Sequence, residues 1–440
     1  MQKVSRLYWP LLVTPKNAVT KPVDTVSKSQ KLMTDLGLLK PATNGTFQIM
    51  PIAQRSLDKL CNLVNDAMFS VDGQKCSLPV LTSSSLWKKS GRLKGDITEF
   101  FMLRDRHDKS FLLSPTHEEA ITSMLASTAP ISYRQLPLRL YQIGPKFRDE
   151  LKARFGLMRA KEFIMKDMYT FDRTEDEARE TYELVNEAYT KLFKQLEVPF
   201  KKVEACTGMM GGKVSHEYHY ISSAGEDNLL HCKNCNYAFN VEVTGETDNN
   251  VSCLKCKSSD VEQVKGMEVA HAFLLGDRYS KVFNATYLHT DGKPKTLIMG
   301  CYGIGISRIL AASLEVLSTE NELKWPSLLA PYDVCVIGPK QGSKEAHQGD
   351  LVEENLLEQL KTICRRELLH DDRKYLTIGK RLMDAKRMGY PIIIVIGSKS
   401  CEQVPKVEVH INGVSKELEI NLALTEITDY LKHKTSLALL

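Results

Sequence analysis

The sequence has no apolar run of membrane-spanning length and no secretory signal, which argues against a membrane-spanning protein and against a secreted disulfide scaffold. Its most apolar stretch, Ile392 to Ile396, is short and β-branched, which predicts a buried strand. The formal net charge is only +5, so a polyanionic partner is permitted but not required. The chain is large. Its 440 residues, of which 42% are hydrophobic, predict a large core divided between two or more domains.

Eleven cysteines in a chain without a secretory signal predict reduced thiols rather than disulfides. Four of them follow the pattern C-x2-C-x17-C-x2-C, the spacing of a zinc ribbon with four thiolate ligands. Such a site would be structural, because four thiolates leave no open coordination position for chemistry. Unligated cysteines are the alternative. The four residues are Cys232, Cys235, Cys253 and Cys256.

Acidic side chains are scarce in the first thirty residues, where Asp24 stands against five basic residues and six serines or threonines. This composition is typical of a mitochondrial presequence, and we expect residues 1–29 to direct import into the mitochondrial matrix. A disordered basic tail has the same composition, so both interpretations stay open. The basic residues are Lys3, Arg6, Lys16, Lys21 and Lys28.

Helical spacing of apolar residues predicts helices over residues 53–68 and 178–196, the second with Thr174 as N-cap. Thr116 and Glu119 form the pattern of a capping box after a predicted strand, Ser110 to Leu113. That pattern predicts a helix over residues 119–126 and by itself requires no function.

The most informative stretch is Tyr141 to Phe171, whose two ends alternate with a period of two around the basic, irregular segment Leu151 to Ala160. This predicts an antiparallel hairpin with a long loop, in which Arg148 and Glu150 share one face of the first strand. Ionised side chains are rarely buried unless a partner or ligand contacts them, and the alternative is an exposed sheet edge. The face of the second strand, which suits a small cationic and partly apolar ligand, consists of Phe163, Met165, Asp167 and Tyr169.

Three segments resemble the signature motifs of the class II aminoacyl-tRNA synthetases, and they occur in the order typical of that family. The helix over residues 53–68 and the strand Cys76 to Leu81 resemble motif 1, which forms the dimer interface in that family. F-R-D-E, a basic loop and R-x-K-E-F resemble motif 2, and the G-x-G-x-x-R that ends at Arg308 resembles motif 3. The resemblance implies an α+β fold with a catalytic domain on an antiparallel sheet, and a homodimer.

This resemblance implies an ATP site with three catalytic residues, Arg148, Glu150 and Arg308. Arg148 would grip the α-phosphate and the amino-acid carboxylate, and Glu150 would lie near the adenine. Arg308 would lie along the β- and γ-phosphates, where a guanidinium stabilises the leaving pyrophosphate. Catalysis would need ATP, Mg²⁺ and positioning, without a side-chain nucleophile. The other ATP contacts implied are Arg159, Phe163, His271 and, as the residue that holds Mg²⁺, Glu268.

Two further segments are similar to the prolyl-tRNA synthetases of bacterial and mitochondrial type. Thr116-x-Glu118 resembles the loop that holds the imino nitrogen of proline, and a secondary ammonium does require acceptors such as a hydroxyl and a carboxylate. Residues 207–217 resemble the T-G-x-x-G-G-x-x-S-H-E segment of these enzymes. Leu274 departs from the glutamine common in bacterial relatives. The proline-binding residues implied are Thr116, Glu118, Arg148, Met165, Asp167, Tyr169, Phe273 and Cys301.

The last hundred residues alternate strands and helices, which predicts a smaller α/β domain. It resembles the anticodon-binding domain of the class IIa enzymes, and the match implies that Arg373 reads an anticodon base. A surface ion-pair cluster is the alternative for Asp371 to Arg373. We therefore expect a catalytic domain over residues 30–328, with a cysteine-bearing insert at about 228–262, and an anticodon-binding domain over 329–440.

The reaction implied is formation of prolyl-adenylate from L-proline and ATP, followed by transfer of proline to tRNA(Pro) in mitochondrial translation. A catalytically inactive accessory protein and a class IIa enzyme for another amino acid are the rival hypotheses. The former would not need the arginines and glutamates of motifs 2 and 3, and the Thr116 to Glu118 loop argues against the latter. No editing domain of bacterial size fits between motifs 2 and 3, where the chain has only the cysteine-bearing segment.

Overall fold

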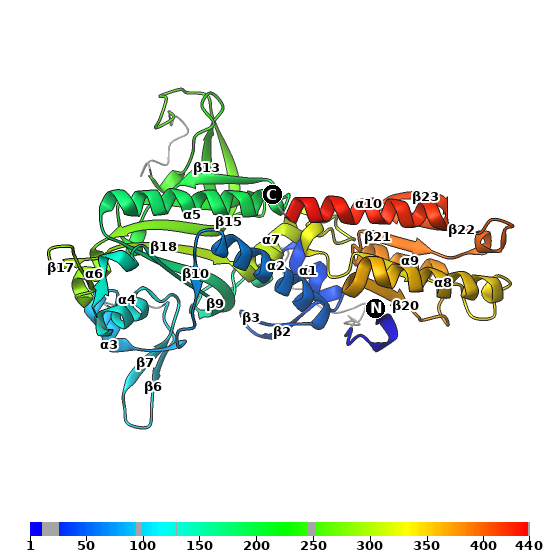
Figure 1. The fold of residues 1–440 in the computed structure, drawn as a ribbon, viewed down its shortest axis with the longest axis horizontal. Coiled ribbons are helices and arrows are strands. Elements are labelled where there is room, and N and C mark those ends of the chain that lie inside the picture. The colour runs from blue at the N-terminus through cyan, green and yellow to red at the C-terminus, as the bar shows by residue number, and fades with distance from the viewer. Residues whose placement is uncertain (11–25, 94–98, 129, 244–251, 439–440) are drawn as a thin grey trace.

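The computed structural model describes residues 1–10, 26–93, 99–128, 130–243 and 252–438 of the protein. Two units lie end to end along the long axis of the molecule (Figure 1). Within the described ranges, the larger unit is built on a nine-stranded sheet and the C-terminal unit on a six-stranded mixed sheet. The predicted α+β fold with a smaller α/β domain is confirmed.

The large sheet has the strand order β12-β11-β14-β13-β15-β18-β10-β9-β4, and its central pairs are antiparallel. Short strands in three small sheets flank it. The strands of the large sheet are β4 (Gln74–Lys75), β9 (Leu138–Phe147), β10 (Glu162–Asp172), β11 (Phe200–Glu204), β12 (Val214–Ile221), β13 (Asp227–Cys232), β14 (Ala238–Asn240), β15 (Val261–Gly276) and β18 (Ile298–Gly305). The flanking strands are β2 (Leu39–Thr43), β3 (Thr46–Ile49), β5 (Leu81–Ser83), β6 (Met102–Arg104), β7 (Ser110–Leu113), β8 (Ile131–Ser132), β16 (Thr286–Leu288) and β17 (Pro294–Thr296).

The predicted hairpin is present, with β9 and β10 paired in a register that places Phe163 opposite Lys146 and Asp167 opposite Gln142. One detail of the prediction is wrong: β9 ends at Phe147, so Arg148 and Glu150 lie in the loop rather than on a strand face. Backbone pairing with β10 ends with the hydrogen bond from the Arg148 amide to the Lys161 carbonyl, because the next two amides, of Asp149 and Glu150, bond the carbonyls of Glu99 and Arg148 instead.

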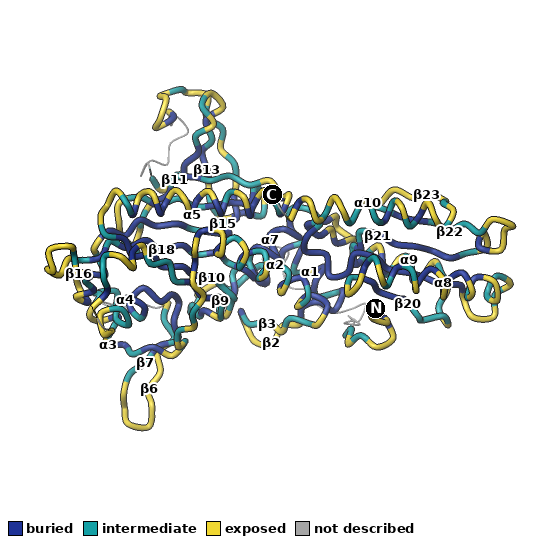
Figure 2. Tube along the Cα trace, viewed as in Figure 1, coloured by how far each residue is buried: buried dark blue, intermediate teal, exposed yellow. Residues whose placement is uncertain are grey.

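Alternation along β10 divides its side chains between two environments. Met168 belongs to the main core beneath the helices, whereas Tyr169 and Phe171 belong to a second apolar cluster on the other face, together with Phe273 and Cys301. Figure 2 shows these central strands as buried. The predicted site residues of the hairpin therefore lie on the face that the long helices leave free.

The long helix α5 covers the other face of the sheet (Figure 1). It forms because apolar residues repeat at helical spacing and because the Thr174 side chain caps it, accepting a hydrogen bond from the Glu177 amide. The predicted cap at Thr116 is wrong: His117 occupies the N-cap position of α4, and the Thr116 hydroxyl bonds the Glu118 carboxylate instead. The helices of the large unit are α1 (Lys28–Asp35), α2 (Pro51–Phe69), α3 (Ser84–Ser90), α4 (Glu118–Ser127), α5 (Glu175–Gln195), α6 (Arg278–Phe283) and α7 (Ile306–Leu317).

The motif 1 region differs in part from the expectation. The helix is present as α2, but residues Cys76 to Val80 connect two short strands, β4 and β5, instead of forming one continuous strand. Pro79 lacks the amide hydrogen that a strand interior needs, which accounts for the interruption.

In the C-terminal unit the strands β1 (Gln2–Lys3), β20 (Leu368–Asp371), β19 (Val334–Ile337) and β21 (Ile392–Val395) pair in parallel. The strands β22 (Lys406–Ile411) and β23 (Val414–Glu419) continue the sheet antiparallel. Its helices are α8 (Ala346–Cys364), α9 (Ile378–Arg387) and α10 (Ile420–Ala438).

Specific contacts join the two units. Arg55 of α2 donates to the Pro331 carbonyl at 2.8 Å and pairs with Glu367, between α8 and β20 of the C-terminal unit, at 3.2 Å. Buried apolar residues of α9 also belong to the main core of the large unit. Among the described helices we find none with the length and apolar content needed to cross a membrane.

Of the predicted presequence, residues 11–25 lie outside the described residues, including Lys16, Lys21 and Asp24. Residues 28 and 29 belong to α1, and residues 2–3 form β1 at the edge of the C-terminal sheet (Figure 1). The presequence stays a prediction for the segment as a whole.

Candidate active site

Two arginines from different elements lie near the loop end of the hairpin. Arg148 follows β9 directly, and Arg308 lies in the first turn of α7. Burial lowers the pKa of Arg148, and the neighbouring positive charge of Arg308 lowers it further. Within the described residues no carboxylate is within ion-pair distance of Arg148, whose guanidinium stacks over the Phe163 ring, 5.2 Å from its centroid. Two adjacent guanidiniums of which one has no counter-ion form a site for an anion with several charges, such as a polyphosphate.

Glu268 anchors the second arginine. Arg308 donates from Nη1 to the Glu268 carboxylate at 3.2 Å and to the Glu268 carbonyl at 3.0 Å. Burial raises the pKa of Glu268, but the hydrogen bond from His271 and the positive charges of His271 and Arg308 outweigh it and hold this pKa well below its usual range. Glu268 is therefore ionised at neutral pH.

Glu217, which sequence reasoning missed as a site residue, joins this group. The ligand atoms of Glu217, Glu268 and His271 all lie within 4.8 Å of one another. Two carboxylates at this spacing provide the hard oxygen ligands that Mg²⁺ prefers, next to the arginines that would hold phosphates. The sequence signal for Glu217 was its place in the segment Ser215-His216-Glu217. In the structure β12 pairs with β15 and sets Glu217 opposite His271.

Glu150 and Arg159 are brought together by the structure. Arg159 donates to Glu150 at 2.9 Å and to Glu226 at 2.6 Å. These partners and Arg154, which also pairs with Glu226, tie the two ends of the loop to the β12–β13 connection. Glu150 and Arg159, both predicted to contact ATP, therefore lie in the same loop region as Arg148. In this structure they bond each other, and Arg159 also bonds Glu226.

At the far end of the same sheet face, Glu118 is fully buried and surrounded by donors. It accepts from the Thr116 hydroxyl at 2.7 Å and from the Cys301 thiol at 3.0 Å. Arg92 donates to it at 3.0 Å and lies 3.4 Å from the second buried carboxylate, Glu119. One arginine between two buried carboxylates leaves an excess of negative charge, which a cationic ligand can neutralise.

Asp167, one of the predicted proline contacts, is the centre of a buried polar cluster. Lys146 lies 2.8 Å from its carboxylate, and Gln142 and the Tyr169 hydroxyl donate to it at 3.0 and 2.7 Å. Burial raises its pKa, but His117, whose Nδ1 lies 3.6 Å from the carboxylate, and the charge of Lys146 outweigh this and lower the pKa to about 2. Asp167 is therefore a permanent anion.

This anion orients the loop that holds Thr116. Tyr169 donates to Asp167, accepts a hydrogen bond from the His117 amide at 2.7 Å, and lies 3.2 Å from the Thr116 hydroxyl. Sequence reasoning missed Lys146 and Gln142, although both alternate with Gly144 along the same strand and their face could have been inferred from the period of two.

The remaining predicted proline contacts lie on neighbouring strands. Register places Phe273 opposite Cys301, and Cys301 opposite Tyr169. The ring of Phe273 stacks on His271 at 3.8 Å between centroids, and Met165 approaches Gly303. Leu274 belongs to the main core beneath the helices, so its departure from glutamine does not alter the wall that contains Phe273.

The four cysteines converge. Cys232 and Cys256 have their sulfurs 3.5 Å apart, Cys235 and Cys253 have theirs 3.6 Å apart, and all four sulfurs lie within 4.8 Å of one another. Four thiols at this spacing and without disulfides have the donor set and geometry of a tetrahedral zinc site. His231 bonds Glu262 instead of pointing to this cluster.

Arg373 is engaged with acids of its own domain. It forms a double hydrogen bond with Asp371, at 2.6 and 2.9 Å, and a third contact with Asp384 at 3.3 Å. In the structure Arg373 is therefore part of an ion-pair cluster, which was the alternative for Asp371 to Arg373. Its contact with an anticodon base remains a prediction.

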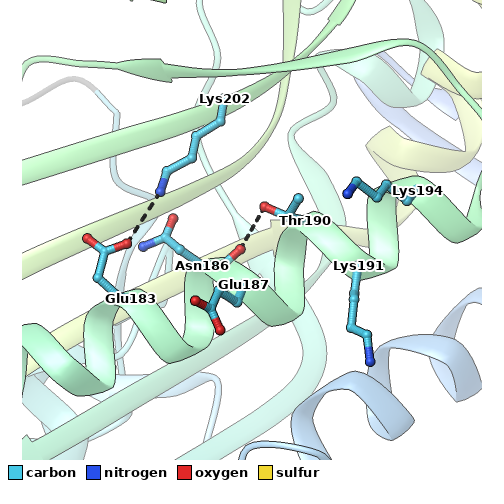
Figure 3. Close-up of a pocket in the computed structure, with 7 residues that line it drawn as sticks. All are labelled: Glu183, Asn186, Glu187, Thr190, Lys191, Lys194 and Lys202. Carbon is cyan, nitrogen blue, oxygen red and sulfur yellow. Dashed lines mark hydrogen bonds and ion pairs between the residues drawn. The ribbon is translucent and has the colours of Figure 1, made fainter. Parts of the chain in front are cut away.

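A hollow of about 330 Å³ lies between α5 and β11 (Figure 3). Figure 3 shows lysines and glutamates around it, and Lys202 pairs across it with Glu183. Since none of the predicted site residues lines this hollow, it does not belong to the candidate active site.

Comparison with known proteins agrees with this geometry. Residues 101–317 match the tRNA synthetase class II core domain (G, H, P, S and T), and residues 333–434 match an anticodon binding domain. These matches define a class II synthetase core joined to an anticodon-binding domain.

Similar proteins narrow the class. The chain is 45% identical over 389 residues to the probable mitochondrial proline–tRNA ligase of Homo sapiens, covering 88% of this chain and 81% of that protein. It is 30% identical over 550 aligned positions to the proline–tRNA ligase of Syntrophomonas wolfei, covering 91% of this chain and 94% of that protein. The fold is similar to that of Giardia lamblia prolyl-tRNA synthetase in complex with prolyl-adenylate, with a TM-score of 0.76, 19% identity, and 94% and 82% of the two chains covered. The chain belongs to the proline–tRNA ligase family, as its motifs predicted.

Proposed function

We propose that the chain activates L-proline with ATP and transfers it to tRNA(Pro) in the mitochondrial matrix. The observation that carries the proposal is a pair of opposite charges beside β10, one next to Phe163 and the other next to Tyr169. Arg148 and Arg308 supply positive charge for a polyphosphate at one end, and Glu118 with Thr116 supplies acceptors for a secondary ammonium at the other. The human and rat relatives, both named as mitochondrial, support the location.

In this mechanism Arg148 holds the proline carboxylate against the α-phosphate, and Arg308 stabilises the departing pyrophosphate. Glu268 fixes Arg308 and, together with Glu217, presents the oxygen ligands for Mg²⁺, which when bound would neutralise phosphate charge. Asp167 and Tyr169 hold the Thr116 loop in place without touching the reacting atoms.

The assay that tests this function is proline-dependent exchange between ATP and pyrophosphate, measured against the other amino acids. Exchange with proline far above exchange with the rest is the expected result. Exchange with another class IIa amino acid, or none at all, would contradict it.

We further propose that the chain works as a homodimer through the motif 1 region. Large apolar side chains are exposed on its elements, with Phe69 at 78% and Leu81 at 50%, and Met102 at 46% on the neighbouring β6. Burial of such side chains against a second copy would remove apolar area from water.

We propose zinc as the occupant of the four-cysteine cluster. Purified protein is expected to hold about one zinc per chain, and Cys232→Ser should lower thermal stability while leaving the KM for proline nearly unchanged. Cys206→Ser, at an exposed cysteine outside the cluster, is the matched control and should leave both values unchanged. Metal-free protein with full stability would refute the assignment.

We also propose that the chain lacks its own proofreading site. The alignment with the Syntrophomonas enzyme extends over 550 positions although this chain has 440 residues, so that relative has a long segment absent here. Rejecting alanine by the missing methylenes of proline is limited to about 1 to 3 kcal/mol for each, so slow formation of alanyl-adenylate is expected. Preformed alanyl-tRNA(Pro) added to the pure enzyme should lose alanine at the spontaneous rate. Faster deacylation would reveal an editing site.

A further inference from the structure

Residues 1–10 form an additional edge of the C-terminal sheet. β1 places Gln2 opposite Leu369 and Lys3 opposite His370. Val4 is 6% exposed, and Ser5 donates from its amide and its hydroxyl to the two Asp372 oxygens, at 2.9 and 2.6 Å. Backbone pairing, a buried apolar side chain and a doubly hydrogen-bonded carboxylate fix this segment independently of one another.

The same segment continues onto the large unit. Trp9 donates from Nε1 to the Leu36 carbonyl at 2.6 Å, while the Arg373 guanidinium lies 5.3 Å from the centroid of a Trp9 ring. Gly37, at a φ of +65°, lies so close that a Cβ there would be 2.4 Å from the Pro10 carbonyl oxygen. The segment thus lies against Asp372 and Arg373 and bridges both domains.

Three side chains of this segment are exposed to solvent. Lys3 and Arg6 are exposed, and neither has an ion-pair partner among the described residues. Tyr8 is 68% exposed, and Tyr375, in the loop after β20 to which Ser5 is bonded, is 71% exposed. Free cations beside exposed aromatic rings are the chemistry that binds unpaired nucleotides, through phosphate contacts and base stacking.

We propose that residues 1–10 contribute to an RNA-binding edge of the C-terminal domain. Tyr8 stacks on an unpaired base of the tRNA anticodon loop, and Lys3 and Arg6 contact its phosphates. The inference rests on the proposed function, because it takes tRNA as the partner. It also means that residues 1–10 stay with the mature enzyme, in contrast to a cleaved presequence.

The test compares the wild-type chain with one variant that combines Lys3→Ala, Arg6→Ala and Tyr8→Ala. The probe is a labelled anticodon stem-loop of tRNA(Pro), and the readout is its affinity as a function of salt. We expect binding to weaken at least about tenfold, since the variant loses one stacked base and two phosphate contacts. The slope of log affinity against log salt should become shallower by about 1.4 units, because two phosphate contacts are lost at about 0.7 each in a single-stranded loop.

The matched control combines Lys399→Ala, Val414→Ala and Lys416→Ala, all exposed residues near the opposite edge of the same sheet. It should bind the stem-loop as the wild type does, and both variants should retain proline-dependent pyrophosphate exchange within about twofold. Equal affinity of wild type and the first variant would overturn this inference alone, whereas absent exchange in the wild type would overturn the proposed function. Enzyme isolated from mitochondria whose first residue lies beyond Tyr8 would also overturn the inference.

Discussion

Arg148→Ala is expected to lower proline-dependent pyrophosphate exchange by about a hundredfold or more, because it removes charge aimed at the phosphate where the transition state develops. The folded protein should tolerate the change. Arg148 has no ion-pair partner within the described residues, and burial and the charge of Arg308 both disfavour its ionised form. Removing it therefore leaves no acid unpaired and relieves repulsion, so the melting temperature should stay equal or rise slightly.

Two controls separate charge from geometry. Arg148→Lys keeps a positive charge but loses the planar fork, and it should recover only a small part of the activity. Arg154→Ala removes an arginine of the same loop that pairs with Glu226, and it should leave exchange within about threefold of wild type. Near-normal exchange in Arg148→Ala, with the protein folded, would refute the role given to motif 2.

The second large effect concerns adjacent glutamates. Glu118→Gln should lower kcat/KM for proline by about a hundredfold, because a charge-assisted hydrogen bond to the imino nitrogen is replaced by a neutral one. The KM for ATP should change little. Glu119→Gln is the matched control: Glu119 is as fully buried and contacts the same Arg92, but its other partner is Ser90 rather than Thr116 and Cys301.

We expect Glu119→Gln to affect stability more than proline affinity. Burial raises the pKa of Glu119, and Arg92 acts against this, so the pair forms a structural contact. Equal losses of proline affinity in the two variants, or a loss in Glu118→Gln that falls equally on ATP, would contradict the assignment of Glu118 as the proline ligand.

Local patterns predicted the parts of the fold that depend on local physics. The period of two around Tyr141 to Phe171 predicted the β9–β10 hairpin, and the apolar spacing of residues 178–196 predicted α5. The spacing of the four cysteines predicted their convergence, which a tetrahedral metal site requires. Errors occurred where local signals compete, as at Thr116, whose hydroxyl bonds a side chain instead of capping α4.

What the sequence could not predict depends on contacts between distant residues. Arg92 meets Glu118 across 26 positions, and Ser5 meets Asp372 across 367. No periodicity in the sequence predicts such pairs, because each contact depends on how the sheets place distant segments of the backbone next to each other. The same limit applies to Arg373, whose neighbours Asp384 and Trp9 come from a helix and from the N-terminal segment.

The sixteen-residue strand β15 couples the two halves of the large sheet through its register. It begins opposite Cys232 of the cysteine cluster and ends opposite the strand that bears Cys301, passing Glu268, His271 and Phe273 on the way. An irregularity in its pairing with β12, between Glu268 and Ala270, places Glu268 beside His271, and inserting or deleting one residue between Val261 and Glu268 would break the register that positions these side chains. During evolution a single-codon insertion or deletion between Val261 and Glu268 is therefore expected to be selected against.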